Sequence, residues 1–393
     1  MRLNVLACVF ALSLAASAAM ASDGTGLNWV YQKTGFQTAD YQTAVAMRDG
    51  QAWPVIFAVN NSSSYYDQNV NAYSLYPTFN SATGTYWHQI GTNLLPVTGS
   101  SSLSAATSST GQIGVVVNSR MSGTSSAAVV GSSSTGFGAA MTGVMAIAFD
   151  SHGNLIKGTA NTIPSSFCPG NLLDIATSPT GDLGAIDDAG RYYQRLAWTG
   201  QWTGGDKFKP QSATWFYNAD LAMDSLGRTH IVGSYDTANG MRLIASDFDI
   251  VNGWTTQTLA SCDWCYFGAT LAADSLGGVG AAWVQSSGSC SELMYAYKDG
   301  GDGWTIREVT TGLWNSNLMN WENVLSEQRV GLAFDANDLP VISFLASSGS
   351  GNNIYLAYDP VSAPEPSTLL LLAAAGTLWF AQKSWLRRAL GKS

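Results

Sequence analysis

The sequence predicts an all-β chain folded as a β-propeller of six or seven four-stranded blades, with seven favoured. Three observations support this prediction. A short strand–turn–strand pattern recurs along the chain, a tryptophan follows the better copies at intervals of about 50 residues, and long helix-forming stretches are scarce. The central region is also too long for one ordinary compact core. It is therefore interpreted as an array of repeats.

Each repeat opens with an apolar strand of small residues that runs into a tight turn. In two copies the turn reads Asp-Ser-Leu-Gly, at 224–227 and 274–277. The aspartate supplies a side-chain acceptor and the glycine tolerates positive φ, which is typical of a hairpin. Seven copies are recognisable, at 44–50, 103–111, 144–153, 173–181, 221–227, 271–277 and 330–338. Their small residues fit a strand crowded against a central axis: Ala44, Ala105, Ala146, Ala176, Ala222, Ala272 and Ala333.

Tryptophans mark the end of the better repeats. They are Trp87, Trp202, Trp254 and Trp304, and the last three are spaced 52 and 50 residues apart. A β-helix or a β-sandwich is the main competing fold, but neither explains these marks.

The two ends of the array complement each other. The last repeat stops at Asp359-Pro360 without a tryptophan strand, whereas residues 27–34 contain the Trp29 strand and no repeat of their own. We therefore expect Leu27 to Thr34 to close the last blade as its outer strand. The pattern weakens between residues 96 and 172. Six blades would follow if Val144 to Gly158 belonged to a neighbouring blade.

The repeat resembles those of sialidase-like (BNR-type) β-propellers. The resemblance rests on the order of apolar strand, Asp-x-x-Gly turn, a Tyr-Ala strand such as 293–297, and Gly-Trp-Thr. It implies an arginine cluster at the axis, an acid/base aspartate and a nucleophilic tyrosine. Here the arginines are scattered, the Ser-x-Asp-x-Gly-x-Thr-Trp box is absent, and the histidines show no triad or metal-ligand spacing. No catalytic residue and no metal ligand is therefore assigned, and His88 and His230 are expected to make structural hydrogen bonds.

The N-terminus has the features of a secretory signal peptide over residues 1–21. A basic Arg2 precedes an apolar run from Leu3 to Ala19, and a small-residue site predicts cleavage between Ala21 and Ser22. The propeller domain is expected to span residues 22–360. The signal peptide predicts that the protein is exported.

The C-terminal segment 361–393 resembles a PEP-CTERM sorting signal. Pro364, Glu365 and Pro366 precede sixteen uncharged residues, 367–382, and a basic end. The segment is expected to be helical but is shorter than the roughly 20 residues that cross a bilayer upright. The resemblance implies a membrane-held precursor that an exosortase-type enzyme cleaves, with the product at the cell surface or in the extracellular matrix. Permanent single-span anchoring is the alternative.

Charge and cysteines limit the partners. Without both terminal segments the chain has 13 basic and 26 acidic residues, so nucleic acid is not expected as a partner. Calcium has only a weak candidate, Asp247-Phe248-Asp249, which a hairpin turn explains better. The remaining cysteines are Cys168, Cys262, Cys265 and Cys290. A disulfide between Cys290 and either Cys262 or Cys265 is expected in an exported protein, with a four-cysteine zinc site as the alternative.

Aromatic residues concentrate in the links that precede the later repeats. The candidate ligand-binding residues are Trp215, Tyr217, Trp264, Tyr266, Trp314 and Trp321. Such rings suit stacking on sugars or peptide side chains, although they could also pack between blades. We expect a non-enzymatic binding module for a glycan or a surface protein. A glycan-active hydrolase or lyase is the alternative, and an axial cluster of carboxylates with arginines would favour it. Purely structural packing in the matrix is a third reading.

Overall fold

The computed structural model describes only part of the chain, and the two terminal segments lie outside it. The described residues are 21–22, 27–38, 42–48, 53–59, 68–80, 85–92, 94, 96–97, 101–107, 113–119, 124–130, 139–142, 145–149, 155–159, 172–178, 182–187, 189–196, 199, 201–208, 216–249, 253–263, 267–287, 290–299, 303–315, 320–326, 328–347 and 351–359. They form strands and turns without a helix, so the all-β prediction is confirmed for them. Across these residues no helix is long and apolar enough to cross a membrane.

The described strands form seven sheets. Six of these contain β3 (Thr43–Arg48), β4 (Trp53–Val59), β5 (Gln68–Asn80), β6 (Thr85–Gly91) and β7 (Pro96–Val97); β8 (Ser101–Thr107), β9 (Ile113–Ser119), β10 (Thr124–Val130) and β11 (Ala139–Thr142); β12 (Met145–Phe149) and β13 (Leu155–Thr159); β14 (Leu172–Thr177), β15 (Leu183–Asp187), β16 (Arg191–Arg195) and β17 (Trp202–Lys207); β18 (Phe216–Met223), β19 (Thr229–Thr237), β20 (Gly240–Asp249) and β21 (Gly253–Cys262); and β22 (Thr270–Ala273), β23 (Val279–Ser287), β24 (Cys290–Lys298) and β25 (Thr305–Thr310).

The seventh sheet joins the two ends of the described chain. It contains β1 (Ala21–Ser22), β2 (Asn28–Thr38), β26 (Gly312–Asn315), β27 (Asn320–Val324), β28 (Gly331–Phe334), β29 (Pro340–Ser347) and β30 (Asn352–Tyr358). β2 pairs antiparallel with β30, and Val30 lies opposite Tyr358. Trp29 on this strand is fully buried. The expected pairing of the N-terminal strand with the last repeat is thereby confirmed.

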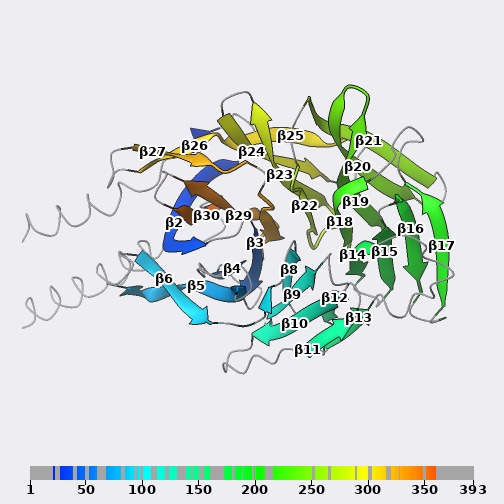
Figure 1. The fold of residues 1–393 in the computed structure, drawn as a ribbon, viewed down its shortest axis with the longest axis horizontal. Coiled ribbons are helices and arrows are strands. Elements are labelled where there is room, and N and C mark those ends of the chain that lie inside the picture. Colours follow the sequence, from blue (N-terminus) through cyan, green and yellow to red (C-terminus); the bar gives the residue numbers. More distant parts are fainter. Residues whose placement is uncertain are drawn as a thin grey trace, which may run out of the picture.

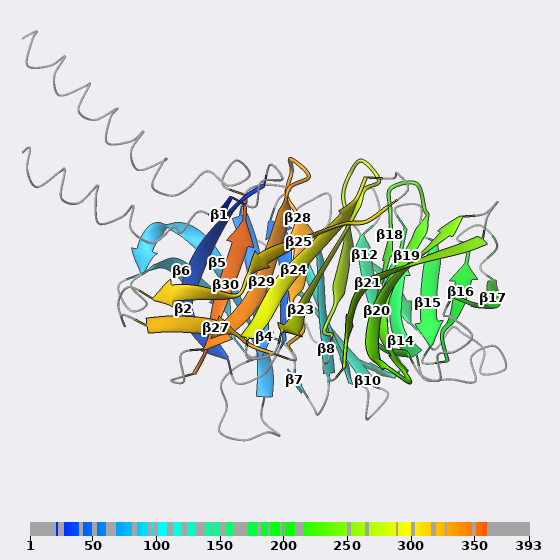
Figure 2. The same cartoon turned by 90° about the horizontal axis from the view of Figure 1, so that it is seen from above.

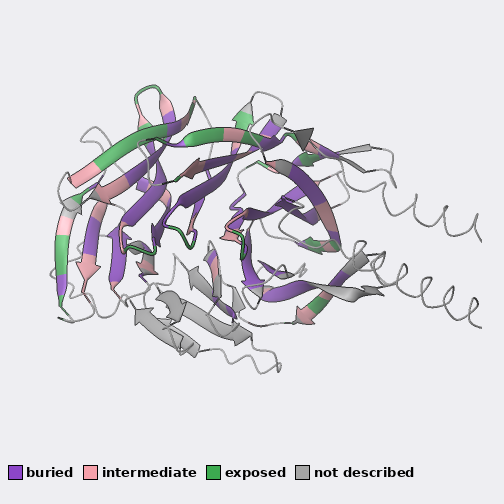
Figure 3. Ribbon diagram, turned by 180° about the vertical axis from the view of Figure 1, so that it is seen from behind, coloured by how far each residue is buried: buried purple, intermediate pink, exposed green. Residues whose placement is uncertain are grey.

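The first strands of successive repeats contact one another in a circuit. The contacts run from β3 to β8, β12, β14, β18, β22 and β28 in that order, and from β28 back to β3 (Figure 1). Each of these strands carries one of the seven alanines predicted beside the axis. The segment Val144 to Gly158, on which the choice between six and seven blades depended, contributes to a separate two-stranded sheet, β12–β13. The later strands of each sheet lie further from the centre, and buried positions concentrate between neighbouring sheets (Figure 3).

The predicted turns are built as the sequence indicates. Asp224 Oδ1 accepts hydrogen bonds from the backbone N–H groups of Leu226 (2.9 Å) and Arg228 (2.8 Å), and Gly227 has a φ of 77°. Asp274 and Asp335 make equivalent bonds in the next two repeats. Each aspartate therefore stands in for a backbone acceptor, which lets four residues reverse the chain.

The repeat-ending tryptophans pack against the preceding sheet. The ring of Trp29 meets Tyr295 edge-on, with centroids 5.7 Å apart, and Trp254 meets Tyr192 edge-on at 5.3 Å. Trp304 belongs to a core cluster that includes Leu243 of the preceding sheet. A tryptophan ends these repeats because its large ring fills the space between two sheets.

One of the links contains regular structure. Residues 312–328 belong to the link before the last repeat, and β26 and β27 form an antiparallel hairpin within this stretch. β27 then pairs with β29, where Val324 lies opposite Ala346. Buried Leu313 and Val324 explain the order, because they join the core cluster between β24 and the last sheet.

Candidate functional site

The structure describes three of the six candidate aromatic residues, and Trp215, Trp264 and Tyr266 lie outside its described part. Tyr217 is half-buried on β18 and packs against a core cluster, so an inter-sheet packing role explains it. Trp314 and Trp321 are directly opposite partners in the β26–β27 hairpin. The hairpin base, at Val324 and Ala346, lies at the end of β29 remote from the Asp335 turn. The two tryptophans thus share one insertion on one side of the ring.

A buried carboxylate holds the base of this hairpin. Glu322 on β27 is 0% exposed. It accepts hydrogen bonds from Lys33 Nζ at 2.7 Å, Asn353 Nδ2 at 2.8 Å and Tyr355 OH at 2.9 Å. Although Glu322 directly follows Trp321 in the sequence, its carboxylate is not available to a ligand at the surface. The side chain instead joins β27 to β2 and β30 because all three donors converge on one buried anion.

Only one of the four candidate cysteines has a described bonding state. Cys262, the last residue of β21, is disulfide-bonded, which confirms a disulfide at this residue. Cys290 is the first residue of β24. Cys168 and Cys265 lie outside the described residues. Among the described residues no group of three or more histidine, cysteine or acidic side chains is arranged to hold a metal ion.

Two carboxylates and an arginine meet where the circuit strands begin. Arg329 Nη2 donates to Asp220 Oδ1 at 2.6 Å, and all three of Asp174, Asp220 and Arg329 are buried. Asp174 Oδ2 accepts from Leu221 N at 2.9 Å, and Asp220 Oδ2 accepts from Leu271 N at 2.7 Å. Each carboxylate therefore ties its own strand to the next strand of the circuit.

Gly268 leaves the space that the backbone at Arg329 needs to pack against it. Gly268 forms isolated parallel bridge pairing with Arg329, and so does Gln42. A Cβ on Gly268 would lie 2.1 Å from the Gln328 carbonyl oxygen and 2.9 Å from Arg329 Cα. Any larger residue would push the two chains apart. Gly268 thus allows Arg329 to reach Asp220 across the intervening strand.

The surroundings of Asp174 favour the protonated form of its carboxyl group. Burial, then the charge of Asp220 and a hydrogen bond with it, raises the pKa of Asp174 well above its usual range. A buried carboxyl beside a second carboxylate keeps its proton more readily than an isolated, exposed one. Such a pair can act chemically as a proton donor next to a carboxylate. Here, however, the same oxygens also accept backbone hydrogen bonds, which is a structural role.

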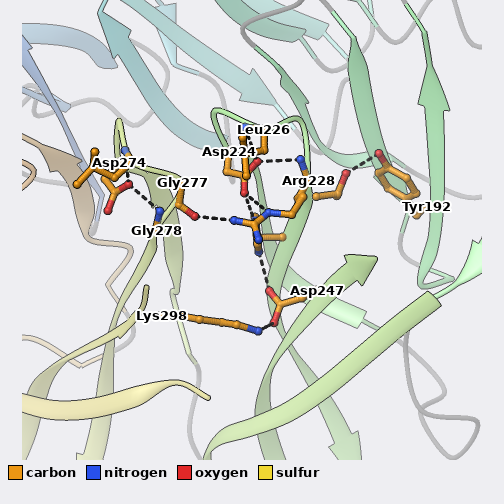
Figure 4. A network of polar contacts seen from close by, with 12 residues as sticks. Tyr192, Asp224, Leu226, Arg228, Asp247, Asp274, Gly277, Gly278 and Lys298 are labelled. Carbon is orange, nitrogen blue, oxygen red and sulfur yellow. Dashed lines mark hydrogen bonds and ion pairs between the residues drawn. The ribbon is translucent and has the colours of Figure 1, made fainter. Parts of the chain in front are cut away.

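A second polar network lies at the turn between β18 and β19 (Figure 4). His230 is buried between two carboxylates, with Nδ1 2.7 Å from Asp247 Oδ1 and Nε2 3.3 Å from Asp224 Oδ2. Lys298 Nζ on the next sheet donates to Asp247 Oδ2 at 2.9 Å. Asp247 therefore bridges His230 and Lys298. Asp249 lies opposite Gly253 in the β20–β21 hairpin.

Protonation follows from these contacts. Burial opposes the charged form of His230, but the hydrogen bonds to Asp224 and Asp247 outweigh it and raise its pKa. For Asp224, burial is outweighed by hydrogen bonds from His230 and Arg228, and its pKa falls to about 2. Arg228 Nη2 also donates to the Gly277 carbonyl at 2.9 Å. The network joins two neighbouring sheets, and the structural role expected for His230 is confirmed.

Sequence reasoning missed the axial cluster of Asp174, Asp220 and Arg329. Asp220 stands four residues before the turn aspartate Asp224, and Asp174 stands four before Ser178, whose hydroxyl accepts from Asp182 N. Alignment of the repeats on their turns would have shown this shared position. Alignment of the repeats does not identify Arg329, because the matching position in the preceding repeat is Gly268.

No protein-family model and no curated protein matches this chain. Three solved structures illustrate the likeness. An ulvan lyase of the polysaccharide lyases has 9% identity and a TM-score of 0.41, over 80% of this chain and 77% of that one. AofleA from Arthrobotrys oligospora has 10% sequence identity and a TM-score of 0.46, over 86% of this chain and 89% of that one. An endo-arabinase from Bacteroides thetaiotaomicron has 8% sequence identity and a TM-score of 0.35, over 83% of this chain and 95% of that one. At these values the likeness carries no inference about ligand or reaction.

Proposed function

We propose that this chain is an exported seven-bladed β-propeller that serves as a non-enzymatic binding module for a glycan or a protein of the cell surface. The closed circuit of first strands and the pairing of β2 with β30 support the propeller. Seven sheets contribute to that circuit, which favours seven blades over six. A ring of this kind offers a fixed platform for binding groups on its links.

The β26–β27 hairpin carries the proposal of binding. It is inserted before the last repeat, and it places Trp314 directly opposite Trp321. Glu322, next to Trp321, is held by three hydrogen bonds to β2 and β30. A site on a firmly held element loses little conformational freedom on binding, and tryptophan side chains suit stacking on sugar rings. The buried carboxylate therefore supports a binding site on a firmly held hairpin.

A glycan array tests this proposal directly. The purified protein is applied to the array, and each positive glycan is titrated against Trp314→Ala, Trp321→Ala and the control Ile306→Ala. Ile306 is exposed on β25, outside the hairpin. Loss of a central aromatic anchor costs about 2 kcal/mol or more, so Kd should rise roughly thirtyfold. Equal affinity of all four proteins would reject the hairpin as the site.

An enzyme is the second candidate, and the axial cluster is the observation that favours it. Asp174 and Asp220 lie beside Arg329, and a carboxyl with a raised pKa is suited to general acid catalysis. A glycan-active hydrolase or lyase would need such groups at the substrate. The variant Asp174→Asn keeps an acceptor for Leu221 N but removes the acidic proton. Release of reducing ends or unsaturated products from polysaccharides by the native protein, lost in this variant, would establish the enzyme reading.

Export and sorting form the third part of the proposal. Residues 1–21 act as a signal peptide, and the segment 361–393 holds the precursor in the membrane until an exosortase-type enzyme cleaves near Pro364-Glu365-Pro366. Its length supports brief retention better than a permanent span. Replacing the three residues with alanine should leave the protein uncleaved and membrane-bound in its host. Identical mature masses of variant and native protein would reject exosortase sorting.

A further inference from the structure

Two leucines on neighbouring turns are unusually exposed. Leu226 is 72% exposed and Leu276 is 81% exposed, and both occupy the third position of an Asp-Ser-Leu-Gly turn. A Cβ on Gly277 would lie 3.8 Å from Leu226 Cδ1, so the Leu226 side chain reaches the neighbouring turn. The hydrogen bond from Arg228 to the Gly277 carbonyl holds the two turns together (Figure 4). The two leucines lie on adjoining turns, and we call them the turn-face leucines.

The chain leaves the last sheet on the same side of the ring. Val341, just after the turn at Asp335, lies opposite Tyr358 at the end of β30. Val30 of β2 also lies opposite Tyr358. The turns after β18, β22 and β28 and the ends of the closing strands therefore share one face (Figure 2). The turn-face leucines and the exit of the chain lie on that face.

The sequence beyond Asp359 limits how far this face can lie from a membrane. The uncharged segment 367–382 begins about eight residues further on. An extended chain covers at most roughly 3.6 Å per residue, so its start lies within about 30 Å of the turn face. When the segment is in a bilayer, the turn face is the face of the ring nearest to the lipid. Moving water-exposed leucine side chains into the lipid interface lowers the free energy, because apolar surface leaves water.

We infer that the turn-face leucines contact the lipid surface while the precursor is held in the membrane. This inference rests on the membrane-held precursor of the proposed function. It also orients the ring. The hairpin with Trp314 and Trp321 starts at the opposite face, so it points away from the bilayer and toward the ligands of the surface layer. The chain is acidic overall, so a zwitterionic lipid suits it better than an anionic one.

Fluorescence quenching by lipid tests the orientation. The full chain is reconstituted into phosphatidylcholine vesicles that contain nitroxide-labelled phosphatidylcholine. An environment-sensitive fluorophore is attached to Leu226→Cys, Leu276→Cys or the control Asn239→Cys, and the unsubstituted chain gives the background. Asn239 is exposed in the β19–β20 turn of the opposite face, on the same sheet as Leu226. Quenching at both leucine positions should exceed that at Asn239 at least threefold.

A second comparison separates contact from simple proximity. With the fluorophore at Ser225→Cys, the double substitution Leu226→Gln and Leu276→Gln should reduce quenching by half or more. Equal quenching on the two faces, or no effect of the double substitution, would overturn the leucine contact while leaving the anchored precursor intact. Failure of the unsubstituted chain to float with vesicles would instead reject the membrane-held precursor, and the lipid contact with it.

Discussion

Replacement of Glu322 by glutamine tests whether one buried carboxylate holds β27 to β2 and β30. Glu322 is fully buried and accepts from three donors, of which Asn353 and Tyr355 are buried and Lys33 is about one-third exposed. Glutamine keeps the shape but has one acceptor oxygen, and its amide group faces the remaining donors. Buried donors then lose their partner.

The expected cost follows from these contacts. Breaking a buried pair by removing one partner costs about 3–5 kcal/mol, and the exposure of Lys33 favours the lower end. Unfolding entropy of about 2.1 cal/mol/K per residue gives roughly 0.7 kcal/mol/K for about 340 residues. A loss of about 3 kcal/mol should therefore lower Tm by about 4 °C.

Calorimetry and urea unfolding measure this effect. The matched control is Glu308→Gln, because Glu308 is exposed on β25. Lys33→Met should also destabilise, because it leaves the fully buried Glu322 carboxylate without its cation while the hydrogen bonds from Asn353 and Tyr355 remain. The reasoning is refuted if Glu322→Gln melts within about 1 °C of the control.

Three further predictions concern single positions. Gly268→Ala should destabilise by about 3 kcal/mol or more, because its Cβ would clash at 2.1 Å with the Gln328 carbonyl; Gly303→Ala, with open space around it, is the control in urea unfolding. The raised pKa of His230 contributes stability that is fully present below about pH 6.5 and is lost as pH rises through the folded value; His230→Gln should flatten the fall in unfolding free energy as pH rises above about 6.5. Reduction of the Cys262 disulfide should lower stability by about 2–4 kcal/mol, and an unchanged melt in reductant would contradict this.

The repeats were predictable because their signals are local. The turn at Asp224 needs only an acceptor and a nearby glycine, and both stand within four residues. The last copy lacks the glycine, yet Asp338 takes its place with a φ of 58°. The Trp29 strand was predictable for a different reason, because a missing strand at one end matched a spare strand at the other.

The polar networks were not predictable in the same way. Arg329 meets Asp220, which is 109 residues away, only because the circuit brings the two strand starts together. Glu322 appears as an exposed polar residue beside Trp321, and its burial depends on two strands from opposite ends of the chain. Neither contact leaves a periodic trace in the sequence.

By itself the sequence determined the all-β class, the repeat, its turn chemistry and the complementarity of its two ends, since each depends on residue spacing or on backbone preferences of a few neighbouring residues. Only the tertiary structure decided which side chains meet: the axial carboxylates with their arginine, the His230 network, and the hairpin held by Glu322. The physical reason is that a hydrogen bond or a buried charge depends on distances of a few ångströms between distant segments, and those distances exist only after the sheets have packed into their circuit.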